Sequence, residues 1–222
     1  FTAQINDGYY PTGINGSKLN FGAGNSTTTV TVSGGAYGEV GVQGSTLSLG
    51  DGVDALNVSL SWEGSTSPMV GLNNNTIDFG AGDDSLVIGL SNTKVQLSSW
   101  GITAGTTQMG AGNDSVSITA VQGMQGTTLN GGDGNDTLTI NSVMLGMDNS
   151  TVDMGAGNDR VVLNESSADA LSVKASKINL GAGDDWIELK RGTATLTGGD
   201  GNDTVYLKGN QANYSWKVSG ND

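Results

Sequence analysis

A six-residue segment built on two glycines recurs along the whole chain, and this repeat constrains the fold more than any other feature. Its eight copies begin at Phe21, Leu49, Phe79, Met109, Gly131, Met154, Leu180 and Gly198. Numbered from 1 to 6 within a copy, positions 2 and 4 are always Gly, and position 6 is Asp except at Ser26. Successive copies lie 18 to 30 residues apart, counted between the position-2 glycines. Such unequal spacing predicts a fixed bend joined to sides of variable length.

The sequence on either side of each copy alternates between apolar and polar residues, as a half-buried strand does. Leu, Ile or Val fills 22 of the 24 apolar slots, and the exceptions are Thr28 and Thr107. One strand–bend–strand unit cannot bury its own apolar face, but stacked units can. We therefore expect an all-β, right-handed parallel β-helix of about eight coils, with one Gly-Asp bend per coil. The longer intervals leave room for a third strand, so the coil should narrow toward the C-terminus.

Composition and charge restrict the function. The chain has 37 Gly but only 2 Pro, and this abundance of Gly, Ser, Thr and Val leaves essentially no α-helix expected. Without Cys or His there are no disulfides, no Cys or His nucleophile and no ordinary zinc site. A net charge of −13 disfavours nucleic acid and anionic lipid, and no stretch is apolar enough to insert into a membrane. The acidity favours cation binding.

The bends themselves have the chemistry of a calcium site. Glycines in left-handed conformations can turn the chain and direct carbonyl oxygens toward one point, and the Asn or Asp side chains add further oxygens. Stacked bends would then offer the 6 to 8 oxygen ligands that Ca²⁺ prefers. Twelve of the 22 acids lie in the bends, where they would repel one another without a cation. Ordinary metal-free Asx-Gly turns are the alternative, but they need no fixed set of residues in eight copies.

The residues predicted to form metal sites are the Gly, Asn and Asp residues at positions 2 to 6 of the Asp-bearing copies. They are Gly50, Asp51, Gly52, Asp54, Gly80, Gly82, Asp83, Asp84, Gly110, Gly112, Asn113, Asp114, Gly132, Asp133, Gly134, Asn135, Asp136, Gly155, Gly157, Asn158, Asp159, Gly181, Gly183, Asp184, Asp185, Gly199, Asp200, Gly201, Asn202 and Asp203.

These segments resemble the nine-residue calcium repeat of the RTX (repeats-in-toxin, hemolysin-type) proteins, G-G-x-G-x-D-x-U-x. The stretches 131–139 and 198–206 match all nine slots, whereas the other copies begin with Phe, Leu or Met. The resemblance implies ions held between successive bends by the Asp and by main-chain carbonyls. Seven Asp-bearing bends leave six gaps, hence about six Ca²⁺ ions in one row. The resemblance also implies type I export to the cell exterior.

We interpret residues 1–18 as an N-terminal cap, 19–208 as the calcium-binding β-helix, and 209–222 as a capping strand truncated from a longer protein. The leading hypothesis is a non-catalytic structural module of a secreted or cell-surface protein, of the adhesin or surface-layer type, that folds on binding calcium. Its partners would be a cell-surface polysaccharide, another copy of itself or an unknown protein. One alternative is the RTX portion of a secreted enzyme or toxin. A β-helix polysaccharide lyase is a weaker alternative, because acids outside the bends show no conspicuous pairing.

Two further features of the sequence carry expectations. Trp186, Glu188 and Tyr206 fall in outward-facing slots of the alternating pattern, and we expect them to be exposed. The Asn73–Asn74–Asn75 run and Asn149–Ser150 are expected at a second bend, as stacked polar ladders.

Overall fold

The computed structural model describes residues 1–8, 11–35, 38–62, 68–92 and 99–209, and it is a parallel β-solenoid. Its 19 strands all pair in parallel, and the described residues contain no helix, so none is present that could cross a membrane. The strands are β1 (Thr2–Gly8), β2 (Thr12–Asn15), β3 (Lys18–Asn20), β4 (Thr27–Gly35), β5 (Glu39–Gln43), β6 (Thr46–Ser48), β7 (Ala55–Trp62), β8 (Met69–Asp78), β9 (Ser85–Asn92), β10 (Trp100–Ala111), β11 (Ser115–Gln125), β12 (Thr128–Asp133), β13 (Thr137–Asp148), β14 (Thr151–Ala156), β15 (Arg160–Glu165), β16 (Leu171–Ala182), β17 (Trp186–Leu189), β18 (Gly192–Asp200) and β19 (Thr204–Leu207).

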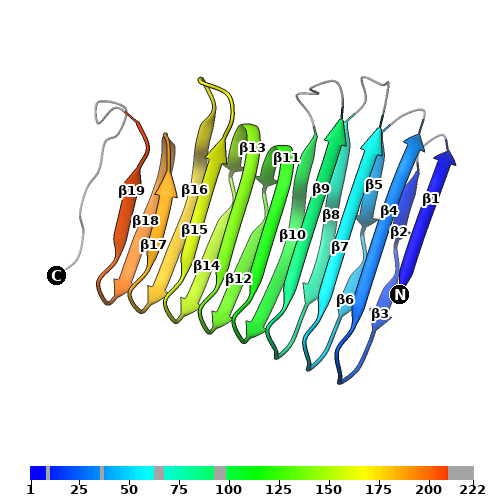
Figure 1. Cartoon of the computed structure of the whole chain (residues 1–222), viewed down its shortest axis with the longest axis horizontal. Coiled ribbons are helices and arrows are strands. Elements are labelled where there is room, and N and C mark those ends of the chain that lie inside the picture. The colour runs from blue at the N-terminus through cyan, green and yellow to red at the C-terminus, as the bar shows by residue number, and fades with distance from the viewer. Residues whose placement is uncertain (9–10, 36–37, 63–67, 93–98, 210–222) are drawn as a thin grey trace.

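The strands that follow the six-residue bends stack in chain order along the molecule (Figure 1). They are β4, β7, β9, β11, β13, β15, β17 and β19, each paired with the next, and β1, which precedes the first bend, pairs with β4. The register keeps equivalent residues together, so that Val30 pairs with Val58 and Val58 with Ile88. All the bends consequently lie along one edge, the lower edge in Figure 1. We call this edge the motif edge and each six-residue turn a motif bend.

The rest of each coil supplies the second and third sides. In the second coil these sides are separate strands, β5 and β6, whereas in the next coil β8 runs through both. The last coil is the narrowest, because β17 ends at Leu189 and β18 starts at Gly192, which pairs with Val173. The predicted third strand and the predicted narrowing are therefore both present.

The alternating pattern predicts the core correctly. Inward slots such as Leu47, Val58 and Ile140 are fully buried, and so are the two Thr exceptions of the pattern. Position 1 of the motif bend also belongs to the core, which the sequence analysis did not anticipate. Leu49, Phe79, Met109, Met154 and Leu180 are all buried there.

The fold class is confirmed, with a slightly smaller number of enclosed coils than the eight expected. Six coils, from β4 to β16, have a described neighbour on both faces. The coils β1–β3 and β17–β18 are end layers with less burial, and Val205 of β19 is 39% exposed although its equivalents are buried. The described part of residues 1–18 continues the stack, since β1 pairs with β4 and β2 with β5. The expected capping strand lies almost wholly outside the described residues.

Candidate metal centre

From the second copy onward, the motif bends stack so closely that only glycine fits at positions 2 and 4. Both glycines have positive φ in every copy, from 76° to 143°. A Cβ on Gly132 would collide with the carbonyl oxygen of Gly110 in the preceding coil, and one on Gly134 with that of Gly112. The position-2 and position-4 carbonyls therefore point along the solenoid axis toward the next bend. The positive φ values confirm that the glycines turn the chain in left-handed conformations.

The Asp at position 6 points into the solenoid, and the seven Asp side chains form a continuous ladder. In each coil, Oδ1 accepts a hydrogen bond from the backbone N–H of position 6 in the preceding coil, over 2.6 to 3.2 Å. The chain of donors and acceptors runs Ser26, Asp54, Asp84, Asp114, Asp136, Asp159, Asp185 and Asp203. We call this row the aspartate ladder.

The second carboxylate oxygen, Oδ2, makes no hydrogen bond in six of these residues. From Asp54 to Asp185 the side chains are nearly fully buried, and in each the Oδ2 atom has no hydrogen-bond partner. The six residues are Asp54, Asp84, Asp114, Asp136, Asp159 and Asp185. Burying a carboxylate oxygen without a partner is costly. A bound cation or a proton would relieve this cost.

The electrostatics of the aspartate ladder also favour a bound cation or a proton. Burial raises the pKa of Asp84 and of Asp136 to about 7, and that of Asp159 to about 6. Neighbouring carboxylates of the ladder add to the rise, whereas the hydrogen bond from the backbone opposes it. The pKa values of Asp114 and Asp185 are raised for the same main reason. The fully ionised ladder is therefore unfavourable without a compensating positive charge.

The remaining predicted site residues lie on the outer side of the motif edge. The position-5 side chains are exposed, and Oδ1 of residues such as Asp83 and Asn113 accepts the N–H of position 5 in the following coil. Asp51, Asp133 and Asp200 at position 3 are also exposed, and their main-chain carbonyls accept the N–H of position 4 in the preceding coil. The structure thus divides the predicted acidic edge into a buried ladder and an exposed set.

The donors at the bend fit a hard cation. A Cβ on Gly131 would occupy the space faced by both Asp136 Oδ2 and the carbonyl oxygen of Met154, one coil further on. At Gly198 the same space is faced by Asp203 Oδ2. No group of three or more acidic, His or Cys side chains comes together among the described residues, so side chains alone could not hold a metal there. Carboxylate and carbonyl oxygens in combination are the donor type that Ca²⁺ takes.

A second bend lies between the second and third sides of the coil. It also turns the chain and provides acceptors for backbone N–H groups, but it does so with uncharged side chains. Its residues with positive φ are Gly16, Gly44, Asn74, Ala104, Gly126, Asn149 and Ala175. The side-chain oxygens of Ser45, Asn75, Ser150 and Ser176, which follow four of these residues, each accept an N–H from the preceding coil. Gly105, which follows Ala104, has no side chain and interrupts the row. This confirms the expected polar ladders at Asn73–Asn75 and Asn149–Ser150.

This second row, the hydroxyl ladder, is complete in its hydrogen bonds. Ser45, Thr127, Ser150 and Ser176 each donate their hydroxyl to the carbonyl two residues earlier, over 2.9 to 3.1 Å. Asn75 accepts with Oδ1 and donates its amide to the Val42 carbonyl. None of these side chains keeps a buried oxygen without a partner.

The expected outward-facing residues divide into two outcomes. Tyr206 is 53% exposed, and its ring stacks on that of Trp186 with 6.2 Å between centroids. The guanidinium of Arg160 covers the Trp186 ring at 3.8 Å. The expectation of exposure was wrong for Glu188, which is only 7% exposed and forms an ion pair with Lys208. The long Lys208 side chain covers the carboxylate, which a two-residue alternation cannot reveal.

No family model matches the chain, and neither the curated proteins nor the solved structures contain a match.

Proposed function

We propose that the chain is a calcium-binding structural module, with ions held along the motif edge between successive bends. The observation that carries the proposal is the row of six buried Oδ2 atoms without hydrogen-bond partners. Each would ligate an ion together with main-chain carbonyls of its own and the neighbouring bend. About six ions in one row would fill the gaps between the seven Asp-bearing bends.

Calcium suits this donor set better than other cations. Ca²⁺ accepts 6 to 8 oxygens in flexible geometry, whereas Mg²⁺ demands a tight octahedron and retains its waters. The bends offer carboxylate and carbonyl oxygens, and the chain has neither His nor Cys. Softer transition metals are thus disfavoured.

Calcium binding would couple to folding. Without an ion, the folded state must bury a line of like charges, and this raises its free energy relative to the unfolded chain. Sites in extracellular modules typically have a Kd on the order of 10⁻⁴ to 10⁻³ M, so they fill outside the cell and empty in the cytosol. The resemblance to RTX repeats supports the same setting. We infer a non-catalytic module of a secreted or cell-surface protein, of the adhesin or surface-layer type.

The test is far-ultraviolet circular dichroism in 10 mM CaCl₂, in 10 mM MgCl₂ and in EGTA, with calorimetric titration of calcium. We expect a β-sheet spectrum in calcium, a largely disordered one in EGTA, little rescue by magnesium, and a stoichiometry near six. Identical spectra in calcium and EGTA, with no heat of calcium binding, would refute the proposal.

A further inference from the structure

A surface recess lies where the first side of the coil turns into the second, at the edge opposite the motif bends. Coils of different length meet there. Nine residues separate Leu90 from Trp100 in one coil, and five separate Glu165 from Leu171 in another. The two coils between them cross directly, from Ala120 to Gln122 and from Ser142 to Leu145. The short crossings leave a hollow of about 380 Å³.

The floor of the recess is an inward-facing column whose chemistry changes along the solenoid. Val32 pairs with Leu60 and Leu60 with Leu90, so the column starts as ordinary core. It continues through Ala120, Ser142 and Glu165, which also pair in register. The side chains first become smaller and then polar. The loss of side-chain volume at Ala120 and Ser142 opens the hollow.

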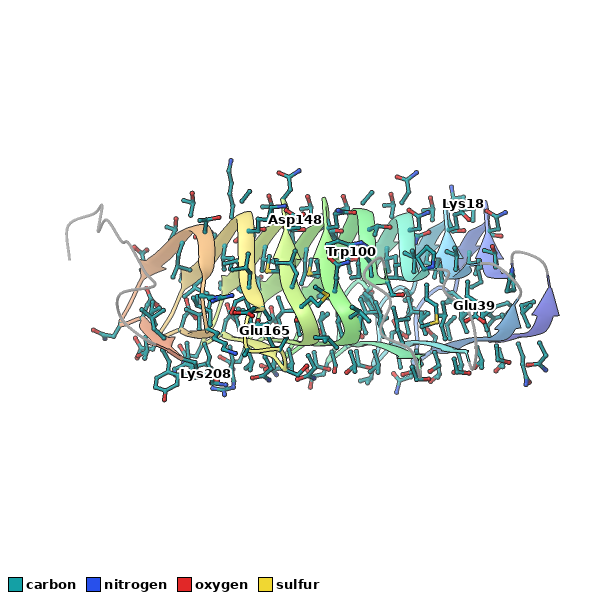
Figure 2. All side chains as sticks on the ribbon, turned by 90° about the horizontal axis from the view of Figure 1, so that it is seen from above. Lys18, Glu39, Trp100, Asp148, Glu165 and Lys208 are labelled. Carbon is teal, nitrogen blue, oxygen red and sulfur yellow. The ribbon has the colours of Figure 1, made fainter. Side chains whose placement is uncertain are left out.

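Two polar side chains that line the recess, those of Ser142 and Glu165, each have a buried oxygen without a partner. Ser142 is only 4% exposed, and its Oγ makes no hydrogen bond. Glu165 receives a 2.9 Å hydrogen bond from Ser172 on Oε2, but its buried Oε1 receives none. Figure 2 shows Glu165 on the inner side of the ribbon, with Lys208 outside it. Burial raises the pKa of Glu165, and the charges of Lys190 and Lys208 oppose that rise.

We propose that this recess binds a neutral pyranose sugar residue. Sugar hydroxyls would donate to Glu165 Oε1 and to Ser142 Oγ, which satisfies both atoms without adding a charge. Leu90, Val121 and Val143 line the same hollow and would contact the apolar face of the ring. Concave sites with apolar walls and a few convergent polar groups are the usual form of small-ligand sites.

The neighbouring charges favour a neutral ligand over a cationic one. Lys190 and Lys208 both act on Glu165 electrostatically, so a second cation beside that carboxylate would be repelled by them. At the rim, the side-chain amide of Asn164 donates to Asn141 Oδ1. The side-chain amides of these two Asn residues could form hydrogen bonds with further hydroxyl groups of the sugar. The site uses none of the motif-bend residues and so goes beyond calcium binding.

The test is saturation-transfer NMR with the methyl glycopyranosides of glucose, galactose and mannose, in calcium and with folding verified by circular dichroism. We expect saturable binding of at least one glycoside. Glu165→Gln keeps the shape of the side chain and should weaken binding at least tenfold. Ala120→Leu continues the Leu60–Leu90 column, fills the hollow and should abolish binding.

Asp78→Asn is the matched control, because Asp78 is an exposed acid of β8 away from the recess. It should bind as the wild type does. The proposal is overturned if no glycoside saturates, if Glu165→Gln and Ala120→Leu both bind like Asp78→Asn, or if n-butylammonium binds where the glycosides do not. All these outcomes are read on protein folded in calcium, so they are separate from a failure of the calcium proposal itself.

Discussion

The motif bend and the second bend turn the same chain, and each buries a polar ladder that caps the N–H groups of the preceding coil. The hydroxyl ladder does this with Ser, Thr and Asn, and every buried side-chain oxygen in it has a partner. The aspartate ladder makes the equivalent bond with Oδ1 and is left with an extra buried oxygen in each of six residues. A solenoid of this kind therefore needs no carboxylate to turn a corner. Folding geometry therefore does not explain the Asp residues of the motif bend, whereas the proposed cation would.

The glycines of the two bends also differ in how much room a Cβ atom would have. At the motif bend, Gly132 has the Gly110 carbonyl where a side chain would lie. At the second bend, Gly126 has nothing within 4 Å of its would-be Cβ, and Ala104 and Ala175 adopt the same positive φ. Except at Gly105, whose Cβ would meet the Asn75 carbonyl oxygen, the second bend needs only a left-handed residue. From Gly50 on, the motif bend also needs room for a main-chain carbonyl of the preceding coil.

The largest effect should come from closing the motif bend. Gly132→Ala would force two coils apart, and we expect a loss of about 5 kcal/mol or more, in the range of the most damaging single substitutions. Gly126→Ala should cost no more than about 1 kcal/mol, because only backbone strain opposes it. Urea denaturation in calcium measures both. Equal losses would show that the two bends are not different in this respect.

The next largest effect should come from one ladder carboxylate. Asp136→Asn keeps an oxygen to accept the Asp114 N–H but removes the leftover carboxylate oxygen. With a Kd on the order of 10⁻⁴ M and 10 mM calcium, each lost ion costs about 2.7 kcal/mol, so loss of both flanking ions costs about 5 kcal/mol. Titration calorimetry should show up to two fewer ions. Asp78→Asn, the same change on an exposed acid, should leave stoichiometry and stability unchanged.

Acid should stabilise the calcium-free protein. The folded pKa of Asp84 and of Asp136 is about 7, against about 3.9 for an unperturbed Asp, so the folded state binds more protons between these values. Stability is thus highest at low pH and is lost as the pH rises through about 7. From pH 5 to pH 8 in EGTA we expect a loss of about 3 kcal/mol for each such carboxyl. Thermal melts that improve with rising pH in EGTA would contradict the expectation.

The smallest effect should come from the hydroxyl ladder. Ser150→Ala removes the acceptor of the Thr127 N–H, and a buried unsatisfied donor costs about 1–3 kcal/mol. Because no ion is involved, the loss should be the same at 1 and at 10 mM calcium, whereas that of Asp136→Asn should grow with calcium. Urea denaturation at both concentrations gives the comparison. If the loss of stability caused by Ser150→Ala depended on calcium, an ion would have to lie at the second bend, contrary to the proposal.

Much of the fold could be predicted because one repeat fixes the bend and the two-residue alternation fixes the core. The inward slots around Leu47, Val58 and Ile140 follow directly from that alternation. Position 6 has the same parity as the inward slots two and four residues later, as Asp114 has with Val116 and Ile118. Its burial was therefore readable from the alternation, although the sequence analysis did not use that signal.

The recess shows a different limit. Glu165 continues the inward series of Val161 and Leu163, so an acid in a core slot was a readable signal that the sequence analysis did not use. The small neighbours Ala120 and Ser142 come from other coils. Their position beside Glu165 depends on the pairing register, and the unequal coil lengths hide that register in the sequence.

The two sets of side-chain acceptors also give the solenoid a direction. Asp Oδ1 in the aspartate ladder receives its N–H from the coil before, whereas the position-5 oxygens receive theirs from the coil after. At Ser26 the ladder starts with a donor that has no carboxylate, while Asp203 ends it with one. Of the described stack, one tip is consequently neutral at this ladder and the other acidic. The two ends of the solenoid would therefore present chemically different faces to a surface or molecule that binds end-on. The rod-shaped molecule is thus directional.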